Sequence, residues 1–401
     1  MSFFVIIKTA AMKTSYYQKI VCQVLEDTGI NINGNQPEDP KIRDPRFFKA
    51  VIQNGSLALG EAYMHGWWDC EALDVFFEKI LKAGLDKKVK NKFLLWLQLA
   101  KSSLFNQQSK SRAIVDIDKH YNIGNDLYKN MLDPHMMYSC GYWDNAEDLY
   151  QAQTNKLELI CQKLHLKPGM RVLEIGCGWG GFAVYAAKNF GVEVIGITLS
   201  SEQEKLAKER CQQLNVEIRL QDYRDLNDQF DRIVSIGMFE HVGYKNYPVY
   251  MDVVNRNLKE DGISLLHTIG SNSPSTHRDP WLDKYIFPNS RLPTAVQIIS
   301  AIEKEGFVLQ DWHSFGRYYD YTLMAWLNNF RKSWSLLKHN YNEIFYRMWV
   351  YYLSCCAASF RVGDCNLWQI VFTKLRYDKE YQAVRSICNA VSNDASLLAK
   401  I

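Results

Sequence analysis

The sequence predicts an α/β fold in which a mostly parallel sheet is covered by helices and preceded by an N-terminal helical domain. From Pro168 onward, short apolar strand segments alternate with helical segments, which is the pattern of repeated βα units. The first of these strand segments runs into a glycine-rich turn, as at ligand sites of open α/β sheets. Before about residue 110, apolar residues recur at three- and four-residue spacing and no strand alternation stands out.

The composition is that of a folded protein without a strong charge. Of its 401 residues, 47% are hydrophobic, enough for one large domain or two ordinary ones. The formal net charge is +3, so the totals give no case for a nucleic-acid partner. The ten cysteines form no CxxC pair and no zinc spacing, which predicts a cytoplasmic protein without a metal site. No stretch reaches the roughly 18 apolar residues of a transmembrane helix, so any membrane contact must be peripheral.

The N-terminal domain is expected to span residues 1–110, with helices at YYQKIVCQVLEDTGI and ALDVFFEKILKAGL. Residues 82–112 are both basic and strongly apolar, because DKKVKNK precedes FLLWLQLA. This segment can lie on an anionic membrane surface, which predicts lipid docking. The alternative is a helix whose apolar face packs into the N-terminal domain while its lysines are solvated. Polar residues 106–110 mark the expected boundary with a catalytic domain at 111–401.

The catalytic domain is predicted to contain its strands and helices in strict alternation. Strands are expected at RVLEIGCG, VEVIGITLS, VEIRLQDY, DRIVSIGMF and GISLLHTIG. Helices are expected between them at FAVYAAKNF and EQEKLAKERCQQL. Two aromatic, amphipathic stretches in the C-terminal third, TLMAWLNNFRKSW and EIFYRMWVYYLSCCAASF, are predicted to be helices that lie over the sheet.

The glycine-rich turn after the first strand indicates a nucleotide-type cofactor site. A backbone without side chains lets a ligand approach closely. A dinucleotide site would need an Asp or Glu at the end of the next strand to bind the ribose, but that strand ends in TLS. The pattern therefore favours S-adenosylmethionine (SAM) over NAD. The cofactor residues expected in this turn are Glu174, Gly176, Gly178, Trp179, Gly180 and Gly181.

Polar residues at the ends of the second and third strands can complete the cofactor site. The ribose hydroxyls and the amino-acid end of SAM need polar partners. Ser200 has a second reading as the cap of the helix EQEKLAKE, and both roles are compatible because the cap faces the same crevice. The expected residues here are Thr198, Leu199, Ser200, Gln203, Gln221, Asp222, Tyr223 and Arg224.

A carboxylate stands beside an imidazole where the strand DRIVSIGMF gives way to a loop. These residues are Glu240 and His241. The carboxyl ends of strands in open α/β sheets are where ligands bind, so the pair is predicted to belong to a site.

Several separated motifs then resemble those of the cyclopropane-fatty-acid synthase family. They are VLEIGCGWGGF, GITLSSEQ, LQDYRDL, GMFEHVG and LLHTIG, with MMYSCGYW, YDYTLMAW and WWDCEALDVFFEKIL outside the core of the sheet. The likeness covers nearly the whole chain and is greater to bacterial phospholipid-modifying synthases than to the shorter mycolic-acid enzymes. It implies a Rossmann-like class I SAM-dependent methyltransferase domain. It also implies transfer of a methylene from SAM to the cis double bond of a phospholipid acyl chain.

The resemblance also implies a set of catalytic residues around a bound bicarbonate ion that acts as the base. By motif, the bicarbonate holders are Cys140, Glu240, His267, Ile269 and Tyr319. Tyr318 is a rival to Tyr319, which we prefer because the Tyr-x-x-Thr-Leu spacing is that of the family. His241 is expected to orient or pack rather than to act as the base.

Further residues and partners follow from the same resemblance. Tyr138 and Ser139 match positions that touch the cofactor. Cys356 matches a cysteine considered functional in the family, but no step above requires it, which favours a structural role. The family further implies a homodimer at the inner face of the cytoplasmic membrane. The rival functions are an N-methyltransferase of the same fold acting on a small amine, and a non-catalytic lipid-binding protein.

Overall fold

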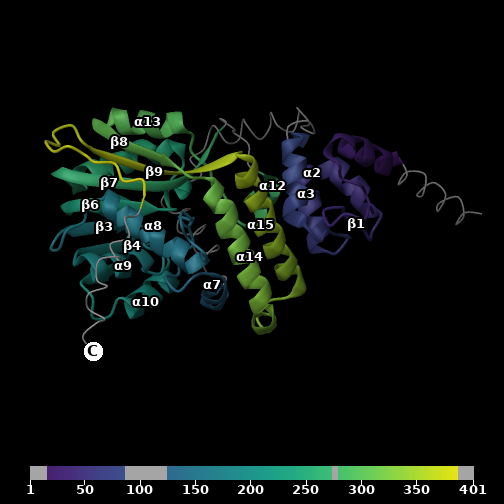
Figure 1. The fold of residues 1–401 in the computed structure, drawn as a ribbon, viewed down its shortest axis with the longest axis horizontal. Helices are drawn as coiled ribbons and strands as arrows, with labels where there is room; N and C mark the ends of the chain where they lie inside the picture. The colour runs from purple at the N-terminus through teal and green to yellow at the C-terminus, as the bar shows by residue number, and fades with distance from the viewer. Residues whose placement is uncertain (1–15, 86–123, 273–278, 387–401) are drawn as a thin grey trace, which may run out of the picture.

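The computed structural model of the protein describes residues 16–85, 124–272 and 279–386. A large sheet lies at one end, the long helices α14 (Arg317–Leu337) and α15 (Glu343–Val362) lie in the middle, and the N-terminal helices lie at the other end (Figure 1). Within the described residues, no helix is both long enough and apolar enough to cross a membrane.

The sheet has seven strands in the order β5-β4-β3-β6-β7-β9-β8. The five strands from β3 to β7 are parallel, whereas β9 runs antiparallel to both of its neighbours, β7 and β8. All five strands predicted from the sequence are present, and the last two were not predicted. The strands are β3 (Arg171–Ile175), β4 (Glu193–Thr198), β5 (Val216–Leu220), β6 (Phe230–Ile236), β7 (Leu258–Ser271), β8 (Phe307–Ser314) and β9 (Cys365–Lys374).

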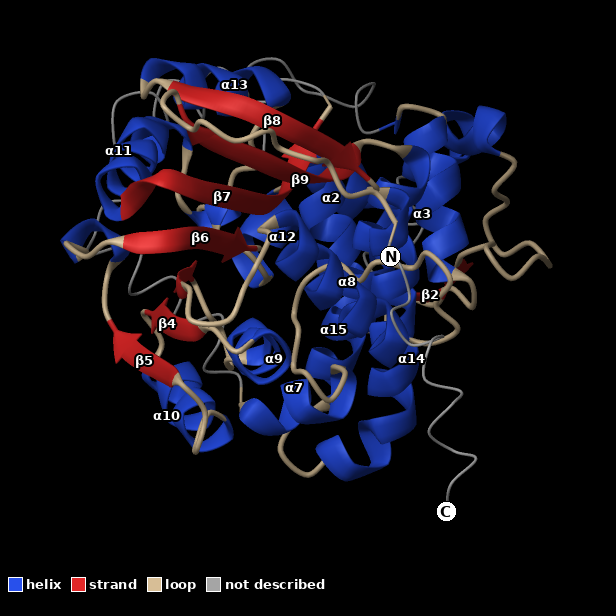
Figure 2. Ribbon diagram, turned by 60° about the vertical axis from the view of Figure 1, so that its left-hand side comes forward, coloured by secondary structure: helices blue, strands red, loops and turns tan. Residues whose placement is uncertain are grey.

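Helices cover both faces of the sheet, which explains why its inner strands are continuous apolar runs (Figure 2). On one face, α8 (Leu149–Lys163) and α9 (Gly181–Phe190) pack against alternate side chains of β3, β4 and β6. On the other face, α11 (Tyr247–Asn257) and α13 (Ala295–Lys304) pack against the intervening side chains. Helix α10 (Ser201–Arg210) packs on β5 through a smaller apolar cluster.

The expected helices α14 and α15 are present, but the prediction that they lie over the sheet is wrong. They pair with each other and pack mainly on α7 (Asn125–Met131), α2 (Arg46–Met64) and α3 (Leu73–Lys82). The physical reason is that their aromatic residues face a second core. In that core, the Tyr351 ring lies 5.7 Å from Tyr63 and 4.9 Å from Phe77.

The N-terminal region is mostly helical, as predicted, with one short exception. Residues 16–25 are helical and are followed by the 3-10 turn η1 (Glu26–Thr28). A two-stranded antiparallel sheet, β1 (Lys41–Ile42) with β2 (Trp68–Asp69), was not predicted because two-residue strands show no alternation. The predicted docking segment beyond residue 85 and the domain boundary at 110 lie outside the described residues.

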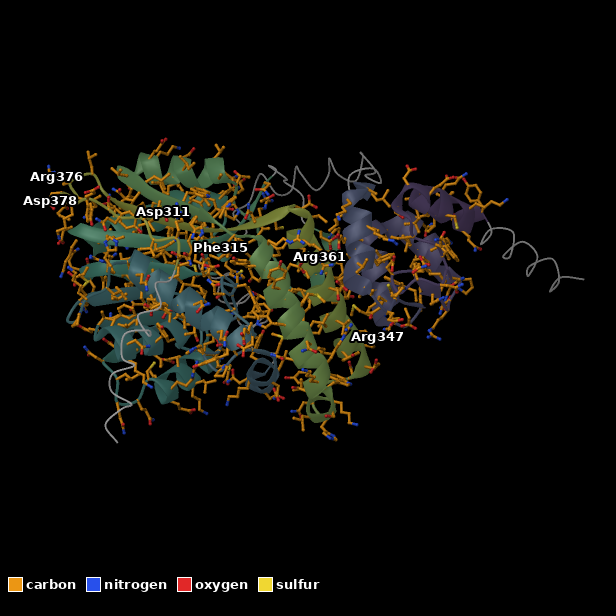
Figure 3. All side chains as sticks on the ribbon, in the orientation of Figure 1. Asp311, Phe315, Arg347, Arg361, Arg376 and Asp378 are labelled. Carbon is orange, nitrogen blue, oxygen red and sulfur yellow. The ribbon has the colours of Figure 1, made fainter. Side chains whose placement is uncertain are left out.

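Charged side chains join the N-terminal helices to the rest of the molecule. Arg361 of α15 contacts Asp74 at 2.9 Å and Glu78 at 3.0 Å, both on α3. Its guanidinium also binds both oxygens of a buried aspartate on α14, Asp320, at 2.9 Å. Arg361 therefore lies at the junction of three helices (Figure 3).

Candidate active site

A pocket opens at the carboxyl ends of β3, β4 and β6, where the sequence predicts a cofactor. Its floor is the glycine-rich turn after β3. Gly176 has a φ of 82°, and a Cβ there would lie 2.8 Å from Met238, so only glycine fits. A Cβ on Gly181 would lie 2.4 Å from the His135 carbonyl oxygen, so this glycine lets α9 approach residues 135–137.

Many of the predicted cofactor residues line this pocket and others support it from behind. Ser200 caps α10 by accepting a hydrogen bond from the Gln203 backbone N–H at 3.3 Å. Asp222 binds the guanidinium of Arg224 at 2.6 Å. The predicted residues that do not line the pocket are Ser200, Asp222, Arg224, Gly180 and Gly181. The predicted residues that do are Tyr138, Ser139, Glu174, Gly176, Gly178, Trp179, Thr198, Leu199, Gln203, Gln221 and Tyr223.

The pocket also has lining residues that the sequence did not indicate as cofactor contacts. His241 is among them, although the sequence had already singled it out beside Glu240. The others are mostly apolar, and only their place beside known strand ends could have suggested them. They are Met136, Met137, Ile175, Cys177, Ile197, Ile236, Gly237 and Met238.

Polar groups in the pocket fit SAM. The Thr198 hydroxyl donates to Gln203 Oε1 at 2.8 Å, which fixes two side chains at the end of β4. Glu174 is buried, and within the part of the chain that the structure describes its Oε2 has no hydrogen-bond partner. Burial raises the pKa of Glu174 well above its ordinary value, and the nearby Lys156 ammonium opposes that rise. A buried carboxylate oxygen without a partner is suited to a ligand ammonium group.

Glu240 lies deeper, in the 3-10 turn η3 (Phe239–His241) after β6. Its Oε1 accepts a hydrogen bond from the Ile269 backbone N–H at 2.7 Å, so two predicted residues are in direct contact. Its Oε2 is buried and has no hydrogen-bond partner among the described residues. Burial raises the pKa of Glu240 from 4.5 to about 7, although the bond from Ile269 lowers it. Glu240 can therefore exchange a proton near neutral pH.

His267 lies on β7, the strand next to the one that leads to Glu240. Its backbone oxygen accepts from the Gly237 N–H at 2.9 Å. Its ring is fully buried, with Nδ1 3.3 Å from Gln369 Nε2. No residue in the described ranges makes a hydrogen bond to its Nε2. Burial lowers the pKa of His267 well below its ordinary value, so the ring is neutral at physiological pH. With the Gln369 amide donating to Nδ1, the proton of the neutral ring is on Nε2.

Cys140 is fully buried and is held near α14. Its Sγ lies 4.0 Å from the Thr322 hydroxyl oxygen. That oxygen accepts hydrogen bonds from the Gly141 N–H at 3.0 Å and from the Trp143 indole at 2.9 Å. Burial raises the pKa of the Cys140 thiol, so it is a neutral thiol and not a nucleophilic thiolate.

The two candidate tyrosines face different neighbours. Tyr319 is buried and stacks on Phe360 at a ring distance of 4.5 Å. Tyr318 is more exposed, and its ring lies 5.5 Å from Tyr142. Burial raises the pKa of Tyr318, and the nearby Cys140 contributes to that rise. The choice of Tyr319 for the bicarbonate contact stays a prediction.

Cys356 lies on α15 near other cysteines. None of the described contacts joins it to Glu240 or His267. It follows Cys355 in the chain. Burial raises the pKa of Cys365, and the nearby Cys356 contributes to that rise. Cys356 also neighbours Tyr352, whose hydroxyl is 2.8 Å from that of Tyr138. Cys356 is therefore near Tyr352, which contacts the pocket residue Tyr138. The functional role of Cys356 stays a prediction.

The sequence is similar to proteins that modify fatty acyl chains. The sequence model of the mycolic acid cyclopropane synthetase family matches residues 108–370. The chain is 54% identical over 368 residues to the cyclopropane-fatty-acyl-phospholipid synthase of Escherichia coli K12, which covers 92% of this chain and 96% of that relative.

Solved structures with the same fold are SAM-dependent enzymes. The cyclopropane synthase MmaA2 from Mycobacterium tuberculosis has a TM-score of 0.62 at 31% identity, covering 65% of this chain and 98% of that one. The mycolic acid cyclopropane synthase CmaA1, solved with S-adenosylhomocysteine (SAH), has a TM-score of 0.62 at 29% identity, covering 65% and 98%. Coclaurine N-methyltransferase has a TM-score of 0.65 at 19% identity, covering 79% and 99%, which shows the fold alone. The predicted methyltransferase fold is confirmed.

Proposed function

Because this chain belongs to the mycolic acid cyclopropane synthetase family and is a SAM-dependent cyclopropane fatty acid synthase, we propose that it acts on unsaturated acyl chains of membrane phospholipids. It transfers a methylene group to the cis double bond, with bound bicarbonate as the general base. The observation that carries the proposal is the pair of buried, unpartnered polar atoms at neighbouring strand ends, Glu240 Oε2 and His267 Nε2.

The cofactor pocket would hold SAM through the glycine-rich turn, Thr198, Gln203 and Glu174. When bound, SAM supplies an electrophilic methyl group on its sulfonium. The turn and the strand ends would hold SAM so that this methyl group faces the acyl chain. An alkene is a poor nucleophile, so this alignment accounts for much of the rate.

We assign the bicarbonate to Glu240 Oε2 and His267 Nε2, which have no hydrogen-bond partner among the described residues. His267 Nε2–H would donate a hydrogen bond to one oxygen of bicarbonate, and the Glu240 carboxylate would accept a hydrogen bond from its hydroxyl group. When bound there, bicarbonate supplies a base for the proton that the transferred methyl loses. The backbone N–H of Ile269 holds the carboxylate in place throughout.

Aromatic side chains around this set exclude water. The ring of Trp326 lies 5.0 Å from Tyr138 and 6.1 Å from Tyr319, and the two tyrosines contact Tyr352 and Phe360 of α15. Their faces also attract positive charge, which develops on the alkene carbons when they attack the methyl. Cys140, a neutral thiol, contributes a weak donor and an apolar surface.

The membrane is reached through the N-terminal domain in this proposal. The basic, apolar segment at residues 82–112 docks on the inner face of the cytoplasmic membrane, and the enzyme works as a homodimer. Replacement of Lys87, Lys88, Lys90 and Lys92 with Glu is expected to reduce sedimentation with anionic liposomes. Unchanged sedimentation would contradict the docking role.

The rival N-methyltransferase function has no specific support. The likeness to coclaurine N-methyltransferase is at 19% identity and concerns the fold. An amine substrate would also give no use to the unpartnered pair at Glu240 and His267.

Mass spectrometry of an unsaturated phospholipid in liposomes tests the proposal, after incubation with purified protein and SAM. We expect a mass gain of one methylene with loss of the olefinic proton signals, reduced when bicarbonate is removed and in Glu240→Ala. An unchanged lipid with intact cofactor binding would support the rival functions. Full activity without bicarbonate would contradict the assignment of bicarbonate as the general base.

A further inference from the structure

A fully buried lysine lies behind the cofactor pocket and has no role in the chemistry described so far. Lys156 is on α8, and its Nζ donates to the Ser139 hydroxyl oxygen at 2.9 Å. Burying an ammonium group is costly, so its charge must be compensated by neighbouring groups. Ser139 lines the pocket, which makes Lys156 a neighbour of the ligand through one intervening side chain.

The backbone around Ser139 is held by other residues. Gln153, one turn before Lys156 on α8, donates from Nε2 to the Ser139 carbonyl oxygen at 2.8 Å. The carboxylate of Asp133 accepts from the His135 N–H at 2.7 Å and from the Met137 N–H at 3.0 Å. Lys156 therefore acts on the Ser139 side chain and does not hold the segment itself.

The direction of the hydrogen bond follows from the chemistry of the two groups. An ammonium group can only donate, so the Ser139 oxygen is the acceptor. The hydroxyl proton of Ser139 is then left to donate elsewhere, and the pocket is the space that Ser139 lines. A donor held in one orientation suits a ligand carboxylate.

The second effect of Lys156 is on Glu174, across the same end of the pocket. Burial raises the pKa of Glu174, and the ammonium of Lys156 lowers it. Lys156 thus favours the ionised form of a carboxylate whose Oε2 makes no hydrogen bond to any described residue. A hydroxyl donor and a free carboxylate together match a group that carries both a carboxylate and an ammonium.

We propose that Lys156 is a positioning residue for the amino-acid end of SAM: it orients the Ser139 hydroxyl toward the ligand carboxylate, at the end of the pocket where Glu174 would accept the ligand ammonium. This role concerns the cofactor alone. It is tested without lipid or bicarbonate, so its failure is distinguishable from failure of the proposed phospholipid reaction.

Calorimetric titration of the full chain with two ligands tests the proposal. SAH carries the amino-acid end, and 5′-methylthioadenosine lacks it. In Lys156→Met we expect SAH affinity to fall by about 10- to 100-fold, the range for losing charge-assisted hydrogen bonds, with methylthioadenosine affinity nearly unchanged. An equal loss for both ligands, or no loss for either, would overturn the proposal.

Lys163→Met is the matched control. Lys163 is also buried on α8, two turns further on, but its Nζ contacts Asp311 at 3.4 Å and His313 at 3.0 Å on β8. This variant loses the same charge from the same helix and should bind both ligands as the wild type does. A selective loss of SAH affinity in Lys163→Met would show that any buried charge on α8 has this effect, which overturns a specific role for Lys156.

Ser139→Ala tests whether Lys156 acts through the hydroxyl. The alanine variant alone should weaken SAH binding, and combining it with Lys156→Met should cost less than the product of the two separate losses. Independent, multiplicative losses would contradict action through Ser139.

A pH series in Glu174→Gln needs no change at Lys156 and so keeps the proposal testable if Lys156→Met does not fold. The groups that face Lys156 are Asp133, His135 and Cys140 in the preceding loop, Glu174 on β3 and His267 on β7. Burial lowers the pKa of Lys156 to about 7, so its charge is lost as the pH rises through that value. Glu174 titrates with the opposite sign, which is why it is replaced. The ratio of SAH to methylthioadenosine affinity should fall between about pH 6 and 8.5, and a constant ratio would overturn the proposal.

Discussion

At the scale of single residues, Glu240 makes folding stability depend on pH. Its pKa is about 7 in the folded protein and 4.5 ordinarily. The folded state therefore keeps a proton that the unfolded chain releases, so the contribution of this group falls as the pH rises across that window. Glu240→Gln keeps an acceptor for the Ile269 N–H but cannot titrate.

We expect the free energy of unfolding of Glu240→Gln, minus that of the wild type, to increase by on the order of 3 kcal/mol as the pH rises from 4.5 to 7. Urea unfolding at several pH values measures this gap, and a gap that is constant with pH would show that Glu240 is not perturbed. The variant should also lose the rise in activity near pH 7 that is expected if the carboxylate accepts from bicarbonate.

A second residue-scale prediction concerns the glycine-rich turn. Gly176→Ala places a Cβ 2.8 Å from Met238, whereas Gly169 has the same φ of 82° with nothing within 4 Å of its added Cβ. Both variants should lose about 1–2 kcal/mol through backbone strain. Only Gly176→Ala should also lose SAH affinity, because it crowds the pocket. Calorimetric binding separates the two, and equal affinities would show that the turn tolerates the added carbon.

The site was predictable where a residue's position in a strand fixed its place. Glu240 and the glycines follow apolar strands, so their location at the carboxyl edge was readable from the sequence. Lys156 and Gln369 were not, because each acts on a partner that only the fold brings near. Gln369 and His267 lie opposite each other on the adjacent strands β9 and β7, but they are 102 residues apart in the chain. No local sequence pattern indicates such a pairing.

At the scale of elements, α14 holds the loop that carries Cys140. The Thr322 hydroxyl accepts from the Gly141 N–H and the Trp143 indole, and it donates to the Tyr318 carbonyl oxygen at 2.8 Å. Thr322→Val keeps the shape but leaves two donors without this acceptor, so we expect a loss of about 2–4 kcal/mol and lower activity.

Thr322→Ser is the control because it retains the hydroxyl and removes one methyl group. It should lose no more than about 1.5 kcal/mol and keep most of the activity. Thermal unfolding and the lipid assay measure both variants. Similar losses in Val and Ser would attribute the effect to packing and not to the hydrogen bonds.

The elements themselves were predicted unevenly. The inner parallel strands β3, β4 and β6 are buried on both faces and read as apolar runs, whereas the edge strand β5 is partly exposed and carries charged residues. β8 mixes buried and exposed positions without clean alternation, and β9 is separated from the long helix α15 by only Gly363 and Asp364. The positions of α14 and α15 could not be predicted because they depend on which elements pack against these helices. A periodic pattern identifies the apolar face of a helix but not the element that covers it.

At the scale of the whole molecule, Arg361 links α3, α14 and α15. Asp320 has only 4% of its side chain exposed and depends on Arg361 for its charge partner. Arg361→Met should therefore cost about 3–5 kcal/mol, because it leaves a buried carboxylate uncompensated. Lys379→Met removes an exposed pair with Asp261 and should cost less than about 1 kcal/mol. Chemical denaturation of both variants measures the difference, and equal costs would mean that Asp320 finds another partner.

The position of β9 in the sheet has a consequence for how the protein reaches its native state. β9 is the last described strand in chain order, yet it lies between β7 and β8. Until it is inserted, β7 has a bare edge that can pair with another chain, and β8 has no described neighbour to join it to the sheet. Assembly therefore cannot proceed simply from the first strand to the last. A chain cut before residue 365 would be an aggregation-prone fragment and not a smaller enzyme, because both the closing strand and Gln369, the partner of His267, would be missing.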